Sequence, residues 1–300
     1  MASRELAALL PKLRANPFDL NASPSALRSG LDQFAHLFPV PGGLAPEPAT
    51  LGGVPAERLG TGADGPVILF IHGGGFVIGS PQSHRHLVAR LAEEVHGEAY
   101  ALDYRLAPEA SCPAALDDVV AAYAALATAH ARPVVLVGDS AGGGLVFSAA
   151  VAIRERGLPP PAALVAISPW VNLGADNPSY DWLAALDPML SRAVTQYFST
   201  RYLAGRPSDD PVASPLFADL RGLPPVLIQV GDRECFLGDA VDIHQRLIAA
   251  QVDTELRVWK EMFHVWHLYW PILPEGRDAI VEAAAFIRAH AGRSKAEVAE

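Results

Sequence analysis

The feature that most limits what this chain can fold into is a serine held within a short glycine motif. Residues Gly138–Gly142 read Gly-Asp-Ser-Ala-Gly and follow the apolar run Pro133–Val137. A helical stretch of small residues begins at Gly143. An apolar strand that turns into a helix at Gly-x-Ser-x-Gly is the context in which a strained turn presents a serine nucleophile. The sequence therefore predicts Ser140 as the reactive residue of an acyl-transfer site.

A second glycine run supplies candidates for stabilising an oxyanion. The apolar run Pro66–Ile71 ends in His-Gly-Gly-Gly-Phe, residues 72–76. Glycines allow backbone N–H groups to turn toward a ligand oxygen. We predict that the N–H groups of Gly73 and Gly74, together with that of Ala141, form an oxyanion hole. They would stabilise the negative charge that develops when a serine attacks a carbonyl.

The acid and the base that a serine nucleophile needs are expected in the last third of the chain, each after a late strand. Asp232 and Glu234 follow the apolar run Pro225–Val230, and either carboxylate can orient a histidine. His264 is the first histidine after the next apolar run, Thr254–Trp259. The sequence predicts His264 as the base, and from the residues alone both carboxylates stay open as the acid.

Apolar runs of strand length alternate with helix-length segments through the chain. This alternation predicts an α/β fold with a mostly parallel central sheet flanked by helices. Active residues would then lie on loops after the carboxyl ends of strands. Weaker runs between Ala49 and Gly60 are candidates for edge strands. The predicted strands are Val67–Ile71, Glu98–Leu102, Val134–Val137, Ala163–Ile167, Val226–Val230 and Thr254–Val258.

Composition and charge exclude several classes of protein. The 300 residues are 50% hydrophobic, enough for a large core, and 23 basic against 33 acidic residues give a net charge of −10. A negative chain of this kind is not expected to bind nucleic acid or an anionic membrane. Cys112 and Cys235 are too few and too far apart for a disulfide framework. With no export signal and no long apolar run, we expect a cytoplasmic protein.

The remaining histidines and glycines do not indicate a bound metal or cofactor. His84, His86 and His267 each lie near another histidine, but none belongs to a zinc-binding pattern. We expect a structural or solvent-facing role for these three. The glycine-rich segment 138–144 lacks the lysine of a P-loop and the spacing of a dinucleotide-binding loop. No metal and no cofactor are therefore expected.

These motifs, with several others, resemble the bacterial hormone-sensitive lipase family of α/β-hydrolase esterases. The resemblance covers most of the chain and implies an α/β-hydrolase fold with a helical cap. It also implies that His72 braces the glycine run after it. Beyond the two glycine motifs, the resemblance rests on Asp103–Glu109, Pro113–Asp118, Ser168–Trp170 and Leu223–Gly231.

The resemblance further implies which carboxylate is the acid. In the family the acid stands just before a short apolar stretch, here Cys235–Leu237, so Glu234 is favoured over Asp232. Aspartate is the commoner residue at that position, and some members are similar in using glutamate. The catalytic residues expected by resemblance are thus Ser140, Glu234 and His264.

By resemblance, two segments form the cap. Residues 1–45 and 177–220 would cover the serine, whereas residues 46–176 and 221–300 would form the core. Asp187–Leu190 and Tyr197 resemble cap positions that face a pocket, and Phe76 and Trp170 are candidates for its wall. The cap would then shape the substrate pocket.

Taken together, the sequence predicts a serine carboxylesterase that acts on small-molecule esters. By resemblance we expect acyl chains of about two to eight carbons. Amide hydrolysis through the same three residues is one alternative. A noncatalytic small-molecule receptor on the same fold is another, because a fold does not by itself settle function. The oligomeric state stays open, and a homodimer could pair the late strand Thr254–Val258.

Overall fold

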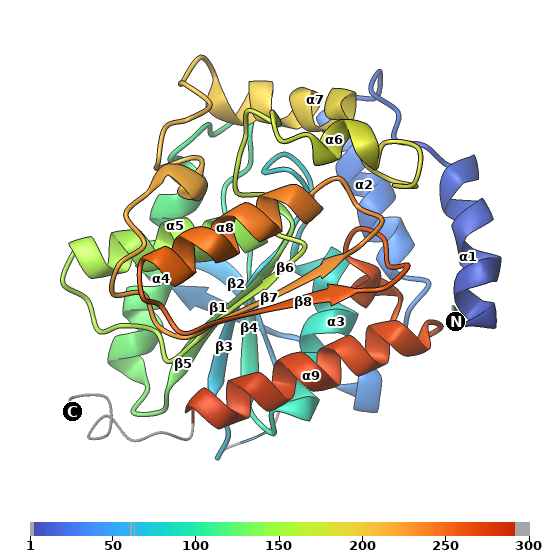
Figure 1. The fold of residues 1–300 in the computed structure, drawn as a ribbon. Coiled ribbons are helices and arrows are strands. Elements are labelled where there is room, and N and C mark those ends of the chain that lie inside the picture. Colours follow the sequence, from blue (N-terminus) through green and yellow to red (C-terminus); the bar gives the residue numbers. More distant parts are fainter. Residues whose placement is uncertain (1–2, 61, 63, 292–300) are drawn as a thin grey trace.

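A twisted eight-stranded sheet crosses the middle of the molecule (Figure 1). The computed structural model describes residues 3–60, 62 and 64–291. The strand order is β1-β2-β4-β3-β5-β6-β7-β8, and the six strands from β4 to β8 in that order pair in parallel. Only β2 pairs antiparallel with both of its neighbours. The predicted mostly parallel sheet is confirmed.

The strands agree closely with the apolar runs of the sequence, and each of the six predicted strands begins within one residue of its observed start. They are β1 (Glu47–Leu51), β2 (Val54–Leu59), β3 (Val67–Ile71), β4 (Glu98–Leu102), β5 (Val134–Asp139), β6 (Leu164–Ile167), β7 (Val226–Gly231) and β8 (Thr254–Trp259). Strand β8 lies at one edge of the sheet, as expected.

The other edge of the sheet is a hairpin that the sequence indicated only weakly. Leu51 pairs with Val54 across the two-residue turn Gly52-Gly53, and both glycines have positive φ. Glycine pairs of this kind form the tight turns that join antiparallel strands. Pro48 lies in β1, where a missing N–H is tolerated because β1 is an edge strand.

Helices cover both faces of the sheet. Helices α3 and α9 pack on one face, and α4, α5 and α8 pack on the other. The core helices are α3 (Pro81–Glu94), α4 (Ala114–Ala129), α5 (Ala141–Glu155), α8 (Leu237–Ala249) and α9 (Pro274–Ala291). The remaining helices are α1 (Arg4–Ala15), α2 (Pro24–Ala35), α6 (Ser179–Trp182), α7 (Arg192–Leu203), and the short η1 (Pro41–Gly43), η2 (Pro215–Phe217) and η3 (Trp266–Tyr269).

Strand β3 shows why the sheet is buried on both faces. All five of its side chains are buried. Val67, Leu69 and Ile71 join the core on the side of α4, α5 and α8. Ile68 and Phe70 join the core on the side of α3 and α9. Because successive strand residues point to opposite faces, a continuous apolar run is the pattern of a central parallel strand.

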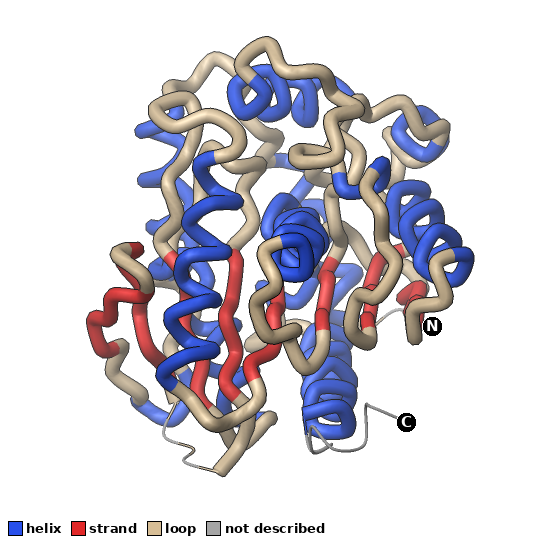
Figure 2. Tube along the Cα trace, turned by 90° about the vertical axis from the view of Figure 1, so that its left-hand side faces the viewer, coloured by secondary structure: helices blue, strands red, loops and turns tan. Residues whose placement is uncertain are grey.

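Helices from the two segments expected to form a cap lie together at one end of the molecule. Figure 1 shows α2, α6 and α7 gathered beyond the sheet, with α1 at the outer side, and Figure 2 shows the strands below a layer of loops and helices. Tyr197 of α7 donates a hydrogen bond to the carbonyl of Ala22, just before α2. Arg28 of α2 forms an ion pair with Glu109 of the core at 2.7 Å.

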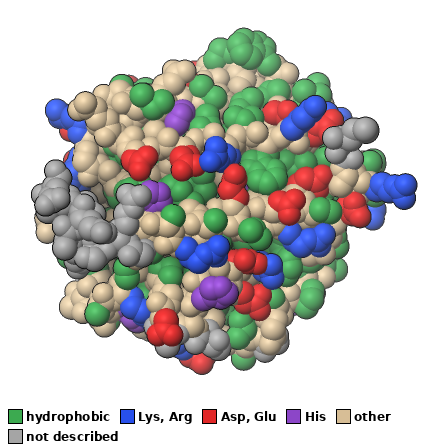
Figure 3. All heavy atoms as spheres, turned by 60° about the horizontal axis from the view of Figure 1, so that its bottom comes forward, with side chains coloured by type: hydrophobic (Ala, Val, Ile, Leu, Met, Phe, Trp, Pro, Cys, Tyr) green, Lys and Arg blue, Asp and Glu red, His purple; other side chains and the backbone are tan. Residues whose placement is uncertain are grey.

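The surface of the described residues carries mixed charge. On the face that Figure 3 shows, acidic and basic side chains lie interspersed among apolar ones. Within the part of the chain that the structure describes, no helix combines the length and the apolar character needed to cross a membrane.

The turn between β5 and α5 is the tightest place in the fold. Ser140 has φ of +54° and ψ of −120°, in a region that residues other than glycine rarely occupy. The turn closes because its two glycines have no side chains. A Cβ on Gly142 would lie 1.9 Å from the carbonyl oxygen of Ile71, and a Cβ on Gly138 would lie 2.5 Å from the carbonyl oxygen of Gly142.

We predict that Gly142→Ala destabilises the protein strongly. The added methyl group would collide with backbone atoms at the end of β3, which cannot move without disturbing the sheet. We expect a loss of about 2 kcal/mol or more in the free energy of unfolding, measured by urea denaturation.

Gly30→Ala in α2 is the matched control. A Cβ there meets nothing within 4 Å, so better helix propensity should raise stability by up to about 1 kcal/mol. Equal effects of both changes would contradict this account of the turn.

Candidate active site

Three side chains from three separate loops form one chain of hydrogen bonds. His264 Nε2 lies 2.9 Å from Ser140 Oγ, and His264 Nδ1 lies 2.7 Å from Glu234 Oε2. A carboxylate only accepts hydrogen bonds, so the proton of the neutral ring is on Nδ1. The lone pair of Nε2 is then free to receive the proton of the Ser140 hydroxyl. All three residues are buried.

The structure brings Glu234, and not Asp232, to the histidine. The second oxygen of Glu234, Oε1, accepts hydrogen bonds from Gly231 N at 2.6 Å and from Ser168 Oγ at 2.8 Å. Asp232 instead accepts a hydrogen bond from the backbone N–H of Glu261 at 2.6 Å. The choice that the residues left open is therefore decided by geometry, since only the Glu234 carboxylate contacts the imidazole.

The glycine run after β3 requires one correction to the predicted oxyanion hole. The N–H of Gly73 donates a hydrogen bond of 3.0 Å to Asp139 Oδ1, so this N–H is already engaged with a carboxylate. Gly74 and Gly75, but not Gly73, line the cavity at Ser140. Gly73 is therefore a poor candidate for an oxyanion donor, whereas Gly74 and Gly75 are the glycines of this run that face the cavity. Ala141 remains a candidate donor, because it is the first residue of α5 and lies at the positive end of that helix.

Asp139 is a buried carboxylate that the sequence analysis did not single out. It lines the same cavity and lies 3.4 Å from His84 Nε2. Burial opposes its ionisation, but His84, then His72 and His264, hold the pKa of Asp139 below its usual value. The signal in the sequence was a charged residue at the end of the buried apolar strand β5. Asp139 thus fixes Gly73 from the side of the nucleophile turn.

Four histidines outside this hydrogen-bond chain, His72, His84, His86 and His267, are buried in the fold. His72 Nδ1 donates to the carbonyl of Gly73 at 2.7 Å, so it braces the glycine run as expected. His84, His86 and His267 are all buried, so the solvent-facing alternative is wrong. Burial, aided by His84, lowers the pKa of His72 to about 3. Burial also lowers the pKa of His86 to about 4 and that of His267 to about 3.

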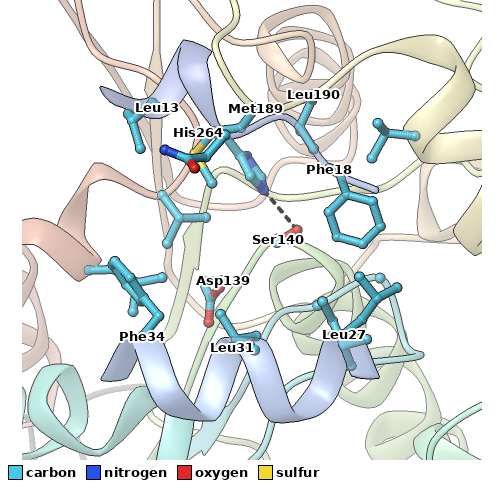
Figure 4. Close-up of a pocket in the computed structure, with 18 of the residues that line it drawn as sticks. Leu13, Phe18, Leu27, Leu31, Phe34, Asp139, Ser140, Met189, Leu190 and His264 are labelled. Carbon is cyan, nitrogen blue, oxygen red and sulfur yellow. Dashed lines mark hydrogen bonds between the residues drawn. The ribbon is translucent and has the colours of Figure 1, made fainter. Parts of the chain in front are cut away.

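Ser140 and His264 open into a largely apolar cavity of about 840 Å³. Figure 4 shows Leu27, Leu31 and Phe34 directed from one face of α2 toward Ser140. Their spacing of four and three residues is that of a single helical face. The opposite wall includes Met189 and Leu190 from the segment before α7. Helix α2 therefore supplies part of the cavity wall. No sequence motif had indicated which residues of the N-terminal segment would line it.

The expected wall residues divide into two groups. Trp170, Met189 and Leu190 line the cavity, as expected. Asp187, Pro188, Phe76 and Tyr197 are not among the residues that line it. At Phe76 and Tyr197, other aromatic rings occupy the ring faces and edges. Phe76 stacks on Tyr202 with ring centroids 3.8 Å apart, and Tyr197 packs edge-on against Phe18 and Phe198.

The described side chains also bear on whether this chain could bind a metal ion. Among residues 3–60, 62 and 64–291, no group of three or more histidine, cysteine, aspartate or glutamate side chains could hold a metal ion. Both cysteines, Cys112 and Cys235, are free and buried.

Comparison with known proteins agrees with this geometry. Residues 68–268 match the family described as alpha/beta hydrolase fold. An acetyl-hydrolase of Streptomyces hygroscopicus is 41% identical over 295 residues, which span 97% of this chain and 99% of that relative. The crystal structure of an esterase from the bacterial hormone-sensitive lipase family has a TM-score of 0.92 at 40% identity, covering 97% of this chain and all of the other. An esterase crystal soaked with p-nitrophenyl butyrate matches with a TM-score of 0.92 at 38% identity, with the same coverage.

The sheet, the strained serine turn and the family match define an α/β-hydrolase. Within that class, the chain belongs to the bacterial hormone-sensitive lipase family of esterases. The fold and the family expected from the sequence motifs are both confirmed.

Substitutions of the two neighbouring carboxylates should have unequal effects. We predict that Glu234→Gln lowers kcat/KM for a short ester by on the order of 10⁴, because a neutral amide cannot hold the Nδ1–H tautomer and stabilise the imidazolium. Asp232→Asn keeps an oxygen that can accept from Glu261 N–H, and we expect it to stay within about threefold of the wild type. Steady-state kinetics on both variants provide the measurement. A larger loss at Asp232 would refute the assignment.

Stability should fall as the pH is lowered below about 6.5. In the unfolded chain His72, His86 and His267 regain ordinary pKa values and bind protons, whereas the folded protein keeps them neutral to about pH 4. Each then removes about 1.4 kcal/mol of stability per pH unit. Burial raises the pKa of Asp239 and that of Asp187, and proton uptake by these folded-state carboxyls offsets part of the loss. We expect a net loss of roughly 3 kcal/mol between pH 6 and pH 5, measured by urea denaturation. An unchanged or rising free energy of unfolding would contradict it.

Proposed function

We propose that this protein hydrolyses short- to medium-chain carboxylic esters through an acyl-enzyme on Ser140. The observation that carries the proposal is the unbroken hydrogen-bond chain from Ser140 through His264 to Glu234, at a cavity with apolar walls. As a member of a family of esterases, with relatives named acetyl-hydrolase and carboxylesterase, the chain is a carboxylic ester hydrolase. The acyl-enzyme route and the residue roles are our proposal.

In the proposed first step, Ser140 Oγ attacks the ester carbonyl while its proton passes to His264 Nε2. The imidazolium that forms is stabilised by the Glu234 carboxylate at Nδ1. Negative charge moves to the carbonyl oxygen, for which we propose the N–H groups of Gly74, Gly75 and Ala141 as donors. Collapse of the tetrahedral intermediate breaks the bond to the alkoxide oxygen. That oxygen takes the proton from Nε2 and leaves as the alcohol.

The second half of the reaction uses the same groups in reverse order. Water gives a proton to His264 Nε2 and attacks the acyl carbon of the Ser140 ester. The second tetrahedral intermediate then expels Ser140 Oγ, which recovers its proton from the imidazolium, and the carboxylic acid is released. No group outside the cavity is required to balance either half.

The two outlying segments, residues 1–45 and 177–220, are proposed as the cap over this site. Leu27, Leu31 and Phe34 from the first segment and Met189 and Leu190 from the second supply walls of the cavity. Walls of this kind favour an apolar small-molecule ester and limit water at the acyl-enzyme. A cytoplasmic location, with no nucleic acid or membrane partner, and a homodimer through the edge strand β8 stay predictions.

A series of p-nitrophenyl esters from acetate to palmitate tests the proposal. We expect hydrolysis to be fastest for acyl chains of about two to eight carbons, because residues of the proposed cap form apolar walls that limit the length of the cavity. Ser140→Ala should lower kcat by on the order of 10⁶. Ser148→Ala, which removes a buried hydroxyl of α5 outside the cavity, is the matched control and should keep nearly full activity.

Three outcomes would count against this function. Activity that is unaffected by Ser140→Ala would remove the acyl-enzyme. A maximum at palmitate would contradict the chain-length limit. Binding of an ester analogue without any turnover would favour the noncatalytic receptor, and turnover of anilides faster than of the matching esters would favour the amide hydrolase.

A further inference from the structure

Asp187 is a buried carboxylate that takes no part in the proposed reaction. It lies in the segment between α6 and α7, and Pro188 separates it from Met189 and Leu190, which line the cavity; its side chain is 8% exposed. Within the described residues no cationic side chain forms an ion pair with it. A buried carboxylate without a cation is costly unless backbone donors satisfy it. Its hydrogen bonds therefore indicate what this carboxylate is for.

All three partners of Asp187 are backbone N–H groups, and they belong to two different parts of the site. Oδ1 accepts from Met189 N at 2.9 Å and from Leu190 N at 2.8 Å. Oδ2 accepts from Cys235 N at 2.8 Å. Met189 and Leu190 form a wall of the cavity at Ser140. Cys235 directly follows Glu234, whose carboxylate holds His264. One carboxylate thus joins a substrate wall to the loop of the acid.

Two further contacts join the same segments at the same residue. Ser179 Oγ donates to the carbonyl of Cys235 at 2.6 Å, and the thiol of Cys235 lies 3.6 Å from the carbonyl of Leu190. The N–H, the carbonyl and the side chain of Cys235 are therefore all bound to residues 179–190. The backbone after Glu234 is held from the cap side, while Gly231 N and Ser168 Oγ hold the Glu234 carboxylate from the core side.

We propose that Asp187 is a positioning residue that sets the substrate wall and the Glu234 loop in a fixed relation to each other. It acts through Glu234 on the alignment of His264, and through Met189 and Leu190 on the fit of the substrate. The proposal deepens the esterase function and rests on it. Because small misplacements of reacting groups cost up to about 10²-fold in rate, a loosened Glu234 loop should be visible in kcat.

The substitution Asp187→Asn separates the two connections. The amide oxygen can still accept from Met189 N and Leu190 N, but the amide nitrogen would face Cys235 N, and two donors cannot bond. We expect kcat on p-nitrophenyl butyrate to fall by about 10- to 100-fold. Asp187→Ala removes both connections. For that variant we also expect KM to rise more for the octanoate than for the acetate, because the wall at Leu190 is no longer held.

A spectroscopic measurement reports on the Glu234 loop without any substrate. The proton between His264 Nδ1 and Glu234 Oε2 should give a low-field ¹H NMR resonance in the wild type, and Glu234→Gln identifies it by its loss. We expect this resonance to shift or broaden in Asp187→Asn. Asp209→Asn, an exposed aspartate of the same cap segment, is the matched control and should leave kinetics and resonance unchanged.

The proposal fails if Asp187→Asn keeps the wild-type kcat and resonance. It also fails if activity falls only in proportion to the folded fraction, with KM ratios and resonance unchanged, because Asp187 would then serve stability alone. If Asp187→Asn does not fold, Ser179→Ala weakens the same connection more mildly, and we expect a loss of about three- to tenfold. A wild type without esterase activity would overturn the proposed function, whereas the resonance would still test the placement of Glu234.

Discussion

The rest of the structure depends on the close contact between the serine turn and the end of β3. Ser140 holds a positive φ, which costs of the order of 1–3 kcal/mol and persists only where the surroundings leave no alternative. Here the carbonyl of Ile71 lies where a Cβ of Gly142 would be, and Ser140 N donates to Ile167 O at 2.8 Å on the next strand. Two parallel strands thereby fix the backbone of the nucleophile and aim its hydroxyl away from the sheet.

Around that turn, the site is assembled from buried polar groups that satisfy one another. Ser168 donates to Glu234 and accepts from Val265 N, so one hydroxyl connects the acid loop to the residue after His264. Asp139 accepts from Gly73 N and connects the nucleophile turn to the glycine run. Such networks are rigid only when every member has a partner. Rigidity of this kind is what hydrogen-bond donors need if they are to stabilise a transition state without first reorganising.

The cavity depends on a different kind of contact, between segments far apart in the chain. A face of α2 near the amino terminus and the segment 187–190 near the middle close over a serine presented by β5. Hydrogen bonds of Asp187 and Ser179 with Cys235 connect this segment to the loop that carries Glu234. Substrate fit and alignment of the histidine are therefore not independent properties in this protein, because the same backbone carries both.

The sequence by itself determined the parallel strands of the sheet and the strained turn at Ser140, since apolar runs of strand length and a Gly-x-Ser-x-Gly turn are local patterns with local causes. It also predicted His264 as the base and limited the candidates for the acid to Asp232 and Glu234. Only the tertiary structure decided between Glu234 and Asp232, because that choice depends on which carboxylate meets a ring 30 residues away. It likewise showed that the N–H of Gly73 is bound to Asp139, and it revealed the hydrogen bonds of Ser168 and Asp187 to the loop of Glu234. Hydrogen bonds between distant segments leave no periodic or spacing signal in the chain.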